Sequence, residues 1–238
     1  MRFPRPLVRG RLIRRYKRFL ADIRLEDGSE VTAHCANPGA MLGVVDPGLP
    51  VWLLESSNTK RKLRWSWELV ETEGTLLGVN TAAPNRLVPE ALARDGIAEL
   101  LGYETVRREV AYGLGSRVDL LLSTPGRPIC YLEIKNVHLR RGTWAEFPDC
   151  VTERGARHMG ELAHMVRAGH RAVVLFVVQR ADCRAFRVAG DLDPAYNRAF
   201  EAARAAGVEA LCYACTVSEA GVDIAESLPL ESWTDGIA

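Results

Sequence analysis

Three ionisable residues stand in apolar runs where free charges are costly. Asp119 lies in SRVDLLLS, and Glu133 and Lys135 lie in ICYLEIKNV. An ionised group in an apolar strand costs several kcal/mol unless it is paired or bound to a metal ion. We therefore expect each of these charges to have a partner or a bound ion.

The geometry of strands predicts that the three groups lie together. Side chains on a strand alternate between faces, so Glu133 and Lys135 share one face. If the two runs pair as a hairpin through the turn TPGRP, Asp119 lies beside Glu133. Two neighbouring carboxylates repel each other, and Mg²⁺ relieves that repulsion while keeping positions for water and phosphate oxygens. Lys135 would then position or deprotonate the attacking water and stabilise charge on a phosphate.

A simpler interpretation competes with this one. Glu133 and Lys135 could form an ion pair on a solvated face of the sheet, which is the usual meaning of an isolated E-x-K sequence. Asp119 in the preceding run, the hairpin spacing and the following helix favour a functional site. Both interpretations remain open at this stage.

The surrounding pattern predicts an α/β domain over residues 84–238. LVPEALARDGIAELLG has helical spacing, three strand-like runs follow, and VTERGARHMGELAHMVRAG is a second helix. The apolar run AVVLFVVQ indicates a central strand covered on both faces, before a further helix and strand. This order predicts a layered domain with a mixed central sheet.

Residues 1–83 predict a separate all-β unit. Short strand-like runs separated by EDGS and NPG indicate a small barrel. Nine of the first 24 residues are Lys or Arg, against one acid, which indicates an anionic partner. A five-stranded barrel with a basic face would be an OB-like fold, which commonly binds oligonucleotides.

Basic residues interleaved with aromatic residues are the candidates for nucleic-acid contact. RLIRRYKRF carries Tyr16 and Phe19, and TKRKLRWSW carries Trp65 and Trp67. Cations that contact phosphates beside rings that stack on bases are typical of single-strand binding. The alternatives are a solvated face for these clusters and a salt-bridged surface for the second helix. The candidates in the first unit are Arg14, Arg15, Lys17, Arg18, Lys60, Arg61, Lys62 and Arg64. On the second helix, Arg154, Arg157 and His158 are candidates for contact with a phosphate beside the metal ion.

The acid–acid–lysine set resembles the motif of the PD-(D/E)xK nuclease superfamily, whose core is a helix, three strands, a helix and a strand. Asp119 stands at the motif's Asp, Glu133 at its second acid and Lys135 at its lysine. The sequence departs from the motif at Val118, where the motif has proline. The resemblance implies a phosphodiesterase site that uses Mg²⁺ or Mn²⁺.

Three further residues are candidates for the same site. Glu109, one strand earlier, is a candidate metal ligand, and Glu99 on the preceding helix is a candidate for the cleft. Gln179 ends the central apolar strand, where site residues often lie in α/β sheets. For the two acids, an unengaged surface position is the alternative.

A wider set of motifs resembles one family. HCANPGAM, SSNTKRKLRWSWELVE, GVNTAAPNRL, YLEIKNV and FPDCVTERGARHMGEL, in this order, are similar to the sugar fermentation stimulation protein A family of bacteria and archaea. The match covers nearly the whole chain. It implies a DNA-binding protein with an OB-like and a nuclease-like domain, and a role in regulating genes of sugar (maltose) metabolism. An active DNA phosphodiesterase is the alternative function.

The remaining expectations concern location and partners. The longest apolar run, AVVLFVV, is too short to span a bilayer, and no apolar segment follows the basic N-terminus as in a signal peptide. We expect a cytoplasmic protein that binds DNA and no membrane, and a homodimer is left open. The six cysteines are expected to be reduced, including the C-x-x-C in CYAC.

Overall fold

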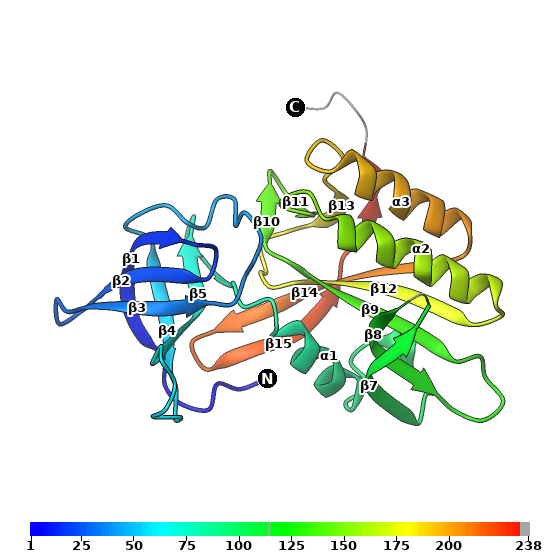
Figure 1. Ribbon diagram of the computed structural model, residues 1–238, viewed down its shortest axis with the longest axis horizontal. Coiled ribbons are helices and arrows are strands. Elements are labelled where there is room, and N and C mark those ends of the chain that lie inside the picture. Colours follow the sequence, from blue (N-terminus) through cyan, green and yellow to red (C-terminus); the bar gives the residue numbers. More distant parts are fainter. Residues whose placement is uncertain (114, 234–238) are drawn as a thin grey trace.

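Five strands of the N-terminal unit close into a barrel, at the left of Figure 1. Neighbouring strands pair in the order β1-β2-β3-β5-β4, and β4 pairs back to β1. All pairs are antiparallel except β3–β5. The structure thus confirms the expected OB-like barrel. The strands are β1 (Val8–Tyr16), β2 (Leu20–Leu25), β3 (Glu30–Cys35), β4 (Pro50–Glu55) and β5 (Trp65–Thr72), and β6 (Thr75–Gly78) extends β5 as a hairpin.

A six-stranded mixed sheet forms the second unit, in the order β15-β14-β12-β9-β8-β7. The pairs β9–β12 and β12–β14 are parallel, and the remaining pairs are antiparallel. The central strand β12 is apolar along almost its whole length because both of its faces are covered. The strands are β7 (Thr105–Tyr112), β8 (Ser116–Ser123), β9 (Cys130–Val137), β12 (Arg171–Val178), β14 (Glu209–Ser218) and β15 (Gly221–Ser227).

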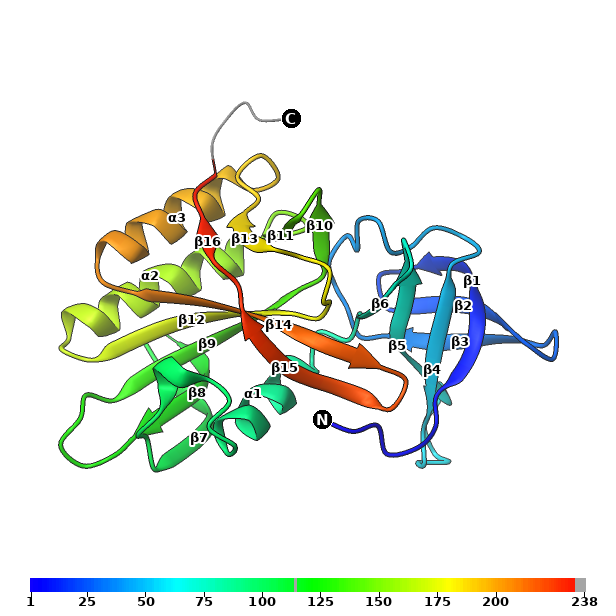
Figure 2. The same ribbon diagram turned by 180° about the vertical axis from the view of Figure 1, so that it is seen from behind.

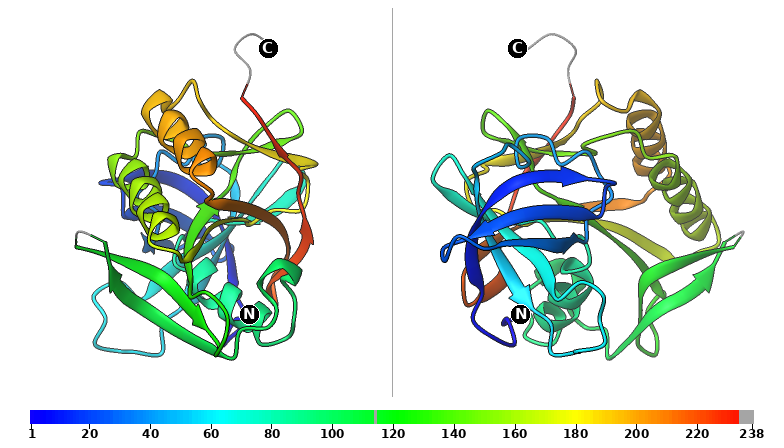
Figure 3. Two further views of the ribbon diagram at one scale, coloured as in Figure 1. Left: turned by 90° about the vertical axis from the view of Figure 1, so that its right-hand side faces the viewer. Right: turned by 60° about the vertical axis from the view of Figure 1, so that its left-hand side comes forward.

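Helices cover both faces of this sheet. The helices α2 (Glu153–Arg167) and α3 (Pro194–Ala205) lie together on one face, and α1 (Pro84–Leu92) packs on the other (Figure 3). A small sheet of β10 (Leu139–Arg141), β11 (Trp144–Phe147), β13 (Ala185–Val188) and β16 (Leu230–Glu231) stands at the end of the sheet (Figure 2). The order α1, β7–β9, α2, β12 is the core of a PD-(D/E)xK nuclease-like domain, as expected.

One expected helix is shorter than the sequence pattern indicates. The run LVPEALARDGIAELLG was expected to be helical throughout, but α1 ends at Leu92. Asp95 adopts a left-handed φ of 56°, and the amide of Gly96 donates to the carbonyl of Ala91, which closes the end of the helix. The later residues form only the 3-10 turn η1 (Ala98–Leu100).

The two units are joined by polar and apolar contacts. The amide of Gly78 donates to the carbonyl of Gln179 at 2.9 Å, and the amide of Met41 donates to Asp149 at 2.7 Å. Met1 is buried in an apolar cluster that joins residues of the second unit to Trp52 and Leu69 of the barrel, so the chain passes this junction before it forms the barrel (Figure 2).

The computed structural model describes residues 1–113 and 115–233, so positions 114 and 234–238 of the expected second domain lie outside the described residues. Within the described ranges, no helix is long and apolar enough to cross a membrane. All six cysteines are free thiols, and both cysteines of CYAC are buried.

Candidate metal site and cleft

The strand register brings Asp119 and Glu133 together. The antiparallel pairs between β8 and β9 run from Leu122–Cys130 to Leu120–Leu132. The same register sets Asp119 level with Glu133 on the neighbouring strand. At this point β8 leaves β9, and the carboxylate of Asp119 accepts a hydrogen bond of 2.7 Å from the amide of Ile134.

Asp119 is held from two sides in a poorly solvated position. In addition to the amide of Ile134, the side chain of Asn85 on α1 donates to Asp119 at 3.2 Å. Burial, followed by the negative charge of Glu133, raises the pKa of Asp119 to about 6. Such a rise is characteristic of a buried carboxyl group beside a second carboxylate.

Glu133 is buried, with its two oxygens in different situations. Its Oε1 accepts from Lys135 at 2.8 Å and also contacts Nδ1 of His158. Burial opposes ionisation, but His158 and Lys135 together hold the pKa of Glu133 below its ordinary value. Its Oε2 is buried without a hydrogen-bond partner.

The interpretation of a solvated ion pair is therefore wrong. Glu133 and Lys135 are paired, but their side chains are only 4% and 12% exposed. The helix α2 lies over this face and supplies His158, which is itself 3% exposed.

Two more buried oxygen atoms are unpaired, those of Tyr112 and Glu161, and Tyr112 lies close enough to Glu133 to feel its charge. The hydroxyl of Tyr112 and Oε2 of Glu161 are both buried without hydrogen-bond partners. Burial and the charges of Glu133, Glu161 and Asp119 raise the pKa of Tyr112. We call this buried region around Glu133, Tyr112 and Glu161 the pocket. Lys135 and His158 both contact Oε1 of Glu133, whereas Oε2 of Glu133, the hydroxyl of Tyr112 and Oε2 of Glu161 have no hydrogen-bond partner among the described residues.

The donor set fits a hard divalent cation. Asp119 and Glu133 offer carboxylate oxygens, and the unpaired Oε2 of Glu133 is a buried acceptor that needs a positive partner. In the part of the chain that the structure describes, no group of three or more His, Cys, Asp or Glu side chains is arranged to hold a metal alone. The site therefore suits an ion such as Mg²⁺, which keeps water or phosphate oxygens beside one or two carboxylates.

A cleft that both units form lies beside the carboxylate pair, and Lys135 is the member of the acid–acid–lysine set that lines it. This cleft has a volume of about 390 Å³ and is lined by Ile134, Lys135 and Asn136 of β9, by Thr152 before α2, and by Arg18 of the barrel. Thr152 caps α2 by accepting a hydrogen bond from the amide of Gly155. One wall of the cleft thus carries Lys135, and a basic residue of the other unit faces the same space.

The basic candidates on α2 have different environments. Arg154 and Arg157 are exposed, and Arg154 donates to Nε2 of His158 at 3.3 Å. His158, one of the residues expected to contact phosphate, is instead buried against Glu133. Residues four apart on a helix share a face, so His158 and Leu162 both point to the sheet.

The three further candidates are not all near the pair. The strand pairs Arg108–Leu120 and Val110–Val118 set Glu109 opposite Asp119 across β7 and β8. Glu109 is nevertheless exposed, and its φ is 53°. Glu99 lies in η1 rather than in α1, and it accepts a hydrogen bond from Tyr213 on β14, two strands beyond β9. The structure therefore does not place Glu99 with Asp119 and Glu133.

Gln179 lies between the units rather than free in the cleft. Its side chain is 1% exposed, donates to the carbonyl of Asn80 at 2.9 Å and contacts the side chain of Asn136. A Cβ on Gly78 would lie 2.3 Å from Oε1 of Gln179, so this seam has no spare space.

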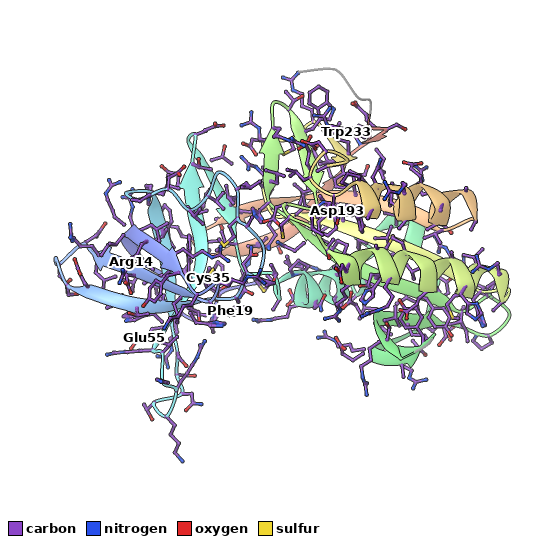
Figure 4. All side chains as sticks on the ribbon, turned by 45° about the horizontal axis from the view of Figure 1, so that its top comes forward. Arg14, Phe19, Cys35, Glu55, Asp193 and Trp233 are labelled. Carbon is purple, nitrogen blue, oxygen red and sulfur yellow. The ribbon has the colours of Figure 1, made fainter. Side chains whose placement is uncertain are left out.

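The basic candidates of the barrel divide into engaged and exposed residues. Arg14 pairs with Asp22 at 2.8 Å, and Arg15 donates to the carbonyls of Asn37 and Gly39 (Figure 4 labels Arg14). Arg64 pairs with Glu55, also labelled there, and Arg61 donates to the hydroxyl of Ser66. The exposed side chains that form no ion pair with any residue in the described ranges are Lys17, Arg18, Lys60, Arg61 and Lys62.

Comparisons with known proteins identify the family. The family model described as "SfsA N-terminal OB domain" matches residues 13–79, and the model described as "Sugar fermentation stimulation protein RE domain" matches residues 82–221. The chain belongs to the sugar fermentation stimulation protein family. This agrees with the resemblance seen in its motifs.

Relatives and a solved structure match along almost their full lengths. Homologues of this family from Paramagnetospirillum magneticum and Rhodospirillum centenum are 57% and 58% identical, over 97% and 98% of this chain and 98% and 100% of theirs. A structure described as Pyrococcus furiosus SfsA in complex with Ca²⁺ has a TM-score of 0.89 at 25% identity, covering 97% of this chain and 98% of that one.

The sequence did not reveal several site residues. Asn85 lies in the family motif GVNTAAPNRL, but nothing in its spacing points to Asp119, which is 34 residues away. His138 and Asp149 also line the cleft, with 3.4 Å between Nε2 of His138 and Oδ2 of Asp149. His138 directly follows the charged strand, which is a signal that the sequence offers, whereas Asp149 is marked only by its place in the motif FPDCVTERGARHMGEL.

Proposed function

We propose that this protein binds DNA and hydrolyses its phosphodiester bonds with Mg²⁺ or Mn²⁺ held by Asp119 and Glu133. The observation that carries the proposal is the unpaired, buried Oε2 of Glu133 on the strand beside Asp119. Lys135 lines a cleft at the same place. A carboxylate pair, an adjacent lysine and an open cleft are what metal-assisted phosphodiester hydrolysis needs.

Each residue has a separate role in this proposal. Asp119 and Glu133 would hold a divalent ion, which would polarise the phosphate and lower the pKa of a water molecule. Asp119 is fixed by Ile134 and Asn85, so its carboxylate does not need to reorganise. Lys135 orients the attacking water and stabilises the negative charge that develops on the phosphate.

His158 is proposed as a positioning residue. It contacts Oε1 of Glu133 and thereby leaves Oε2 of the same carboxylate free to face an ion. Ligand carboxylates are commonly oriented in this way by hydrogen bonds from neighbouring residues.

A divalent ion is supported by the family as well as by the donor set. The solved relative from Pyrococcus furiosus is described as a complex with Ca²⁺. Ca²⁺ and Mg²⁺ both prefer oxygen ligands but differ in size and in the geometry that they demand. We therefore expect Ca²⁺ to bind this site and to compete with Mg²⁺ or Mn²⁺.

The test is cleavage of labelled single- and double-stranded DNA by the purified full-length protein with Mn²⁺ or Mg²⁺. Asp119→Ala and Glu133→Ala should each abolish cutting. Glu99→Ala is the matched control, because Glu99 lies in η1 and accepts a hydrogen bond from Tyr213 on β14, two strands beyond β9. Cutting that persists unchanged in Asp119→Ala and Glu133→Ala would exclude this site.

A second candidate function is DNA binding without cleavage, in a regulator of sugar metabolism genes. The exposed cations of the barrel, such as Lys60 and Lys62, favour it because phosphate contacts need only accessible positive charge. In that case DNA affinity falls steeply with salt, while no metal produces cutting. Binding that does not respond to salt would contradict it.

A further inference from the structure

The structure leaves only one of four aromatic candidates open for stacking. Trp67 is 0% exposed. The guanidinium of Arg14 lies 4.8 Å from the ring centroid of Tyr16, and that of Arg64 lies 5.7 Å from the ring centroid of Trp65. Tyr16 and Trp65 are half-buried, whereas Phe19 is 47% exposed.

The local backbone presents Phe19 in a fixed position. It follows Lys17 and Arg18, whose left-handed φ angles of 49° and 62° turn the chain between β1 and β2. The carbonyl of Phe19 accepts a hydrogen bond of 2.9 Å from the amide of Cys35 on β3. Figure 4 shows Phe19 beside Cys35, on the side of the barrel nearer to the second unit.

A second ring supports Phe19 from one side. The ring centroids of Phe19 and His34 are 6.5 Å apart, and their planes differ by 12°. Burial, with the positive charge of Arg61, lowers the pKa of His34, so its ring is neutral near pH 7. The pair therefore forms an uncharged aromatic surface with one open side.

Cations surround this aromatic surface and connect it to the cleft. Arg18 precedes Phe19 in the chain and lines the cleft that also contains Lys135. Arg61 is close enough to His34 to act on it electrostatically. A ligand that suits this surface has a flat apolar face and several negative charges, which is the chemistry of a nucleotide.

We propose that the Phe19–His34 pair is a stacking site for an unpaired nucleobase, and that the substrate is DNA with a single-stranded segment passing from the barrel to the Lys135 cleft. The inference rests on the proposed function. A continuous duplex keeps the faces of its bases stacked inside the helix, so the ring of Phe19 cannot stack on them. Only the neighbouring cations would then contact the duplex, through its phosphates. A single strand offers both its bases and its phosphates.

The experiment measures binding of fluorescently labelled oligothymidine and of a duplex by the full-length protein, with chelator present so that no DNA is cut. Phe19→Ala should weaken single-strand binding about tenfold and duplex binding less than about twofold. Phe19→Tyr should retain single-strand affinity because a phenol ring still stacks. Val106→Ala is the matched control, since Val106 is 41% exposed on β7 of the other unit.

The possible outcomes separate this proposal from the function on which it rests. Equal losses of single-strand and duplex affinity in Phe19→Ala, or no loss of either, would overturn the stacking site while leaving DNA binding intact. If the unaltered protein binds neither DNA, the proposed function itself fails. A change of molecular mass in Phe19→Ala by light scattering, with unchanged DNA affinity, would instead assign Phe19 to a contact between copies of the chain and overturn the proposal.

Discussion

The barrel surface and the pocket of the second unit use charge in opposite ways. On the barrel, Lys17, Lys60 and Lys62 stand exposed, and none of them depends on a particular partner. In the pocket, Glu133 is buried and shared between Lys135 and His158. One region can therefore contribute many weak and interchangeable contacts, whereas the other contributes a few that depend on each other.

The physical cause of this difference is solvation. Exposed ions interact weakly because water and salt screen them, and single pairs contribute about 0–1 kcal/mol. Buried ions interact strongly, and removing one partner leaves the other unpaired in a poorly solvated place. We therefore expect substitutions in the pocket to have large and specific effects, and substitutions on the barrel to have small and additive ones.

The largest effect is expected for Lys135→Met. If Lys135 stabilises the phosphate, its loss should slow DNA cleavage at saturating DNA by about 100- to 10,000-fold, with DNA affinity changed less than about threefold. Single-turnover cleavage with Mn²⁺, alongside a binding titration, checks this. Lys62→Met is the matched control on the barrel and should cut at the normal rate, so equal rate losses in the two variants would remove the distinction between the regions.

The next largest effect is expected for His158→Leu. This change removes the contact of His158 with Oε1 of the buried Glu133 and leaves Lys135 as the remaining partner, so the free energy of unfolding should fall by about 2 kcal/mol at pH 7. Urea denaturation measures it. Adding Glu133→Gln removes the buried charge and should restore part of the loss. A double variant less stable than His158→Leu would show that the two residues do not form a pair.

Asp119→Asn should stabilise the metal-free protein at neutral pH. The pKa of Asp119 is about 6 in the fold against 3.8 for an ordinary aspartate, so the folded state holds a proton that the unfolded state has lost between these values. The stability that this provides is fully present below about pH 4 and is lost as the pH rises through 6. Asn at this position should remove that loss, a gain of roughly 2 kcal/mol at pH 8.

The measurement for Asp119→Asn is urea denaturation with chelator at pH 4 and at pH 8. The difference in free energy of unfolding between the variant and the unaltered protein should grow with pH. A difference that is constant, or that shrinks as the pH rises, would show that burial and the charge of Glu133 do not raise the pKa of Asp119.

The smallest effects are expected on the barrel. Lys62→Ala should weaken DNA binding a few-fold at low salt and reduce the slope of log affinity against log salt by about one. Arg14→Ala should change the slope less, because Arg14 is already paired with Asp22. Titrations at several salt concentrations compare the two variants, and an Arg14 effect larger than that of Lys62 would reverse our assignment of engaged and exposed cations.

The strand-borne part of the site was predictable from the sequence because its rules are local. Alternation along one strand and a short turn fix Asp119, Glu133 and Lys135 relative to each other, and the structure keeps that register. The closed barrel and the order of helices and strands follow similarly from turns and apolar runs. The end of α1 was not predicted because a left-handed residue at Asp95 outweighs the helical spacing that continues after it.

Contacts between distant elements were not predictable in the same way. His158 lies 25 residues from Glu133, and its face of α2 is set by packing with the sheet rather than by its neighbours in the chain. The burial of Gln179 between the units likewise depends on how the barrel packs against the second unit, and the hydrophobic periodicity of the sequence does not predict that packing. The charge clusters in the sequence indicated where cations lie. They did not indicate which cations, such as Arg14 and Arg15, form hydrogen bonds within the barrel itself.

The seam at Gly78 and Gln179 limits how this protein can be dissected. Met1 is buried at the junction between the units, the chain then builds the barrel, and it returns beside Gln179 through a contact with no room for a side chain on Gly78. A barrel expressed as a separate fragment would lose its amino-terminal anchor and expose that seam to water. Truncations at the linker would therefore yield damaged halves rather than independent modules, and point substitutions in the intact polypeptide are the sound way to assign roles to either half.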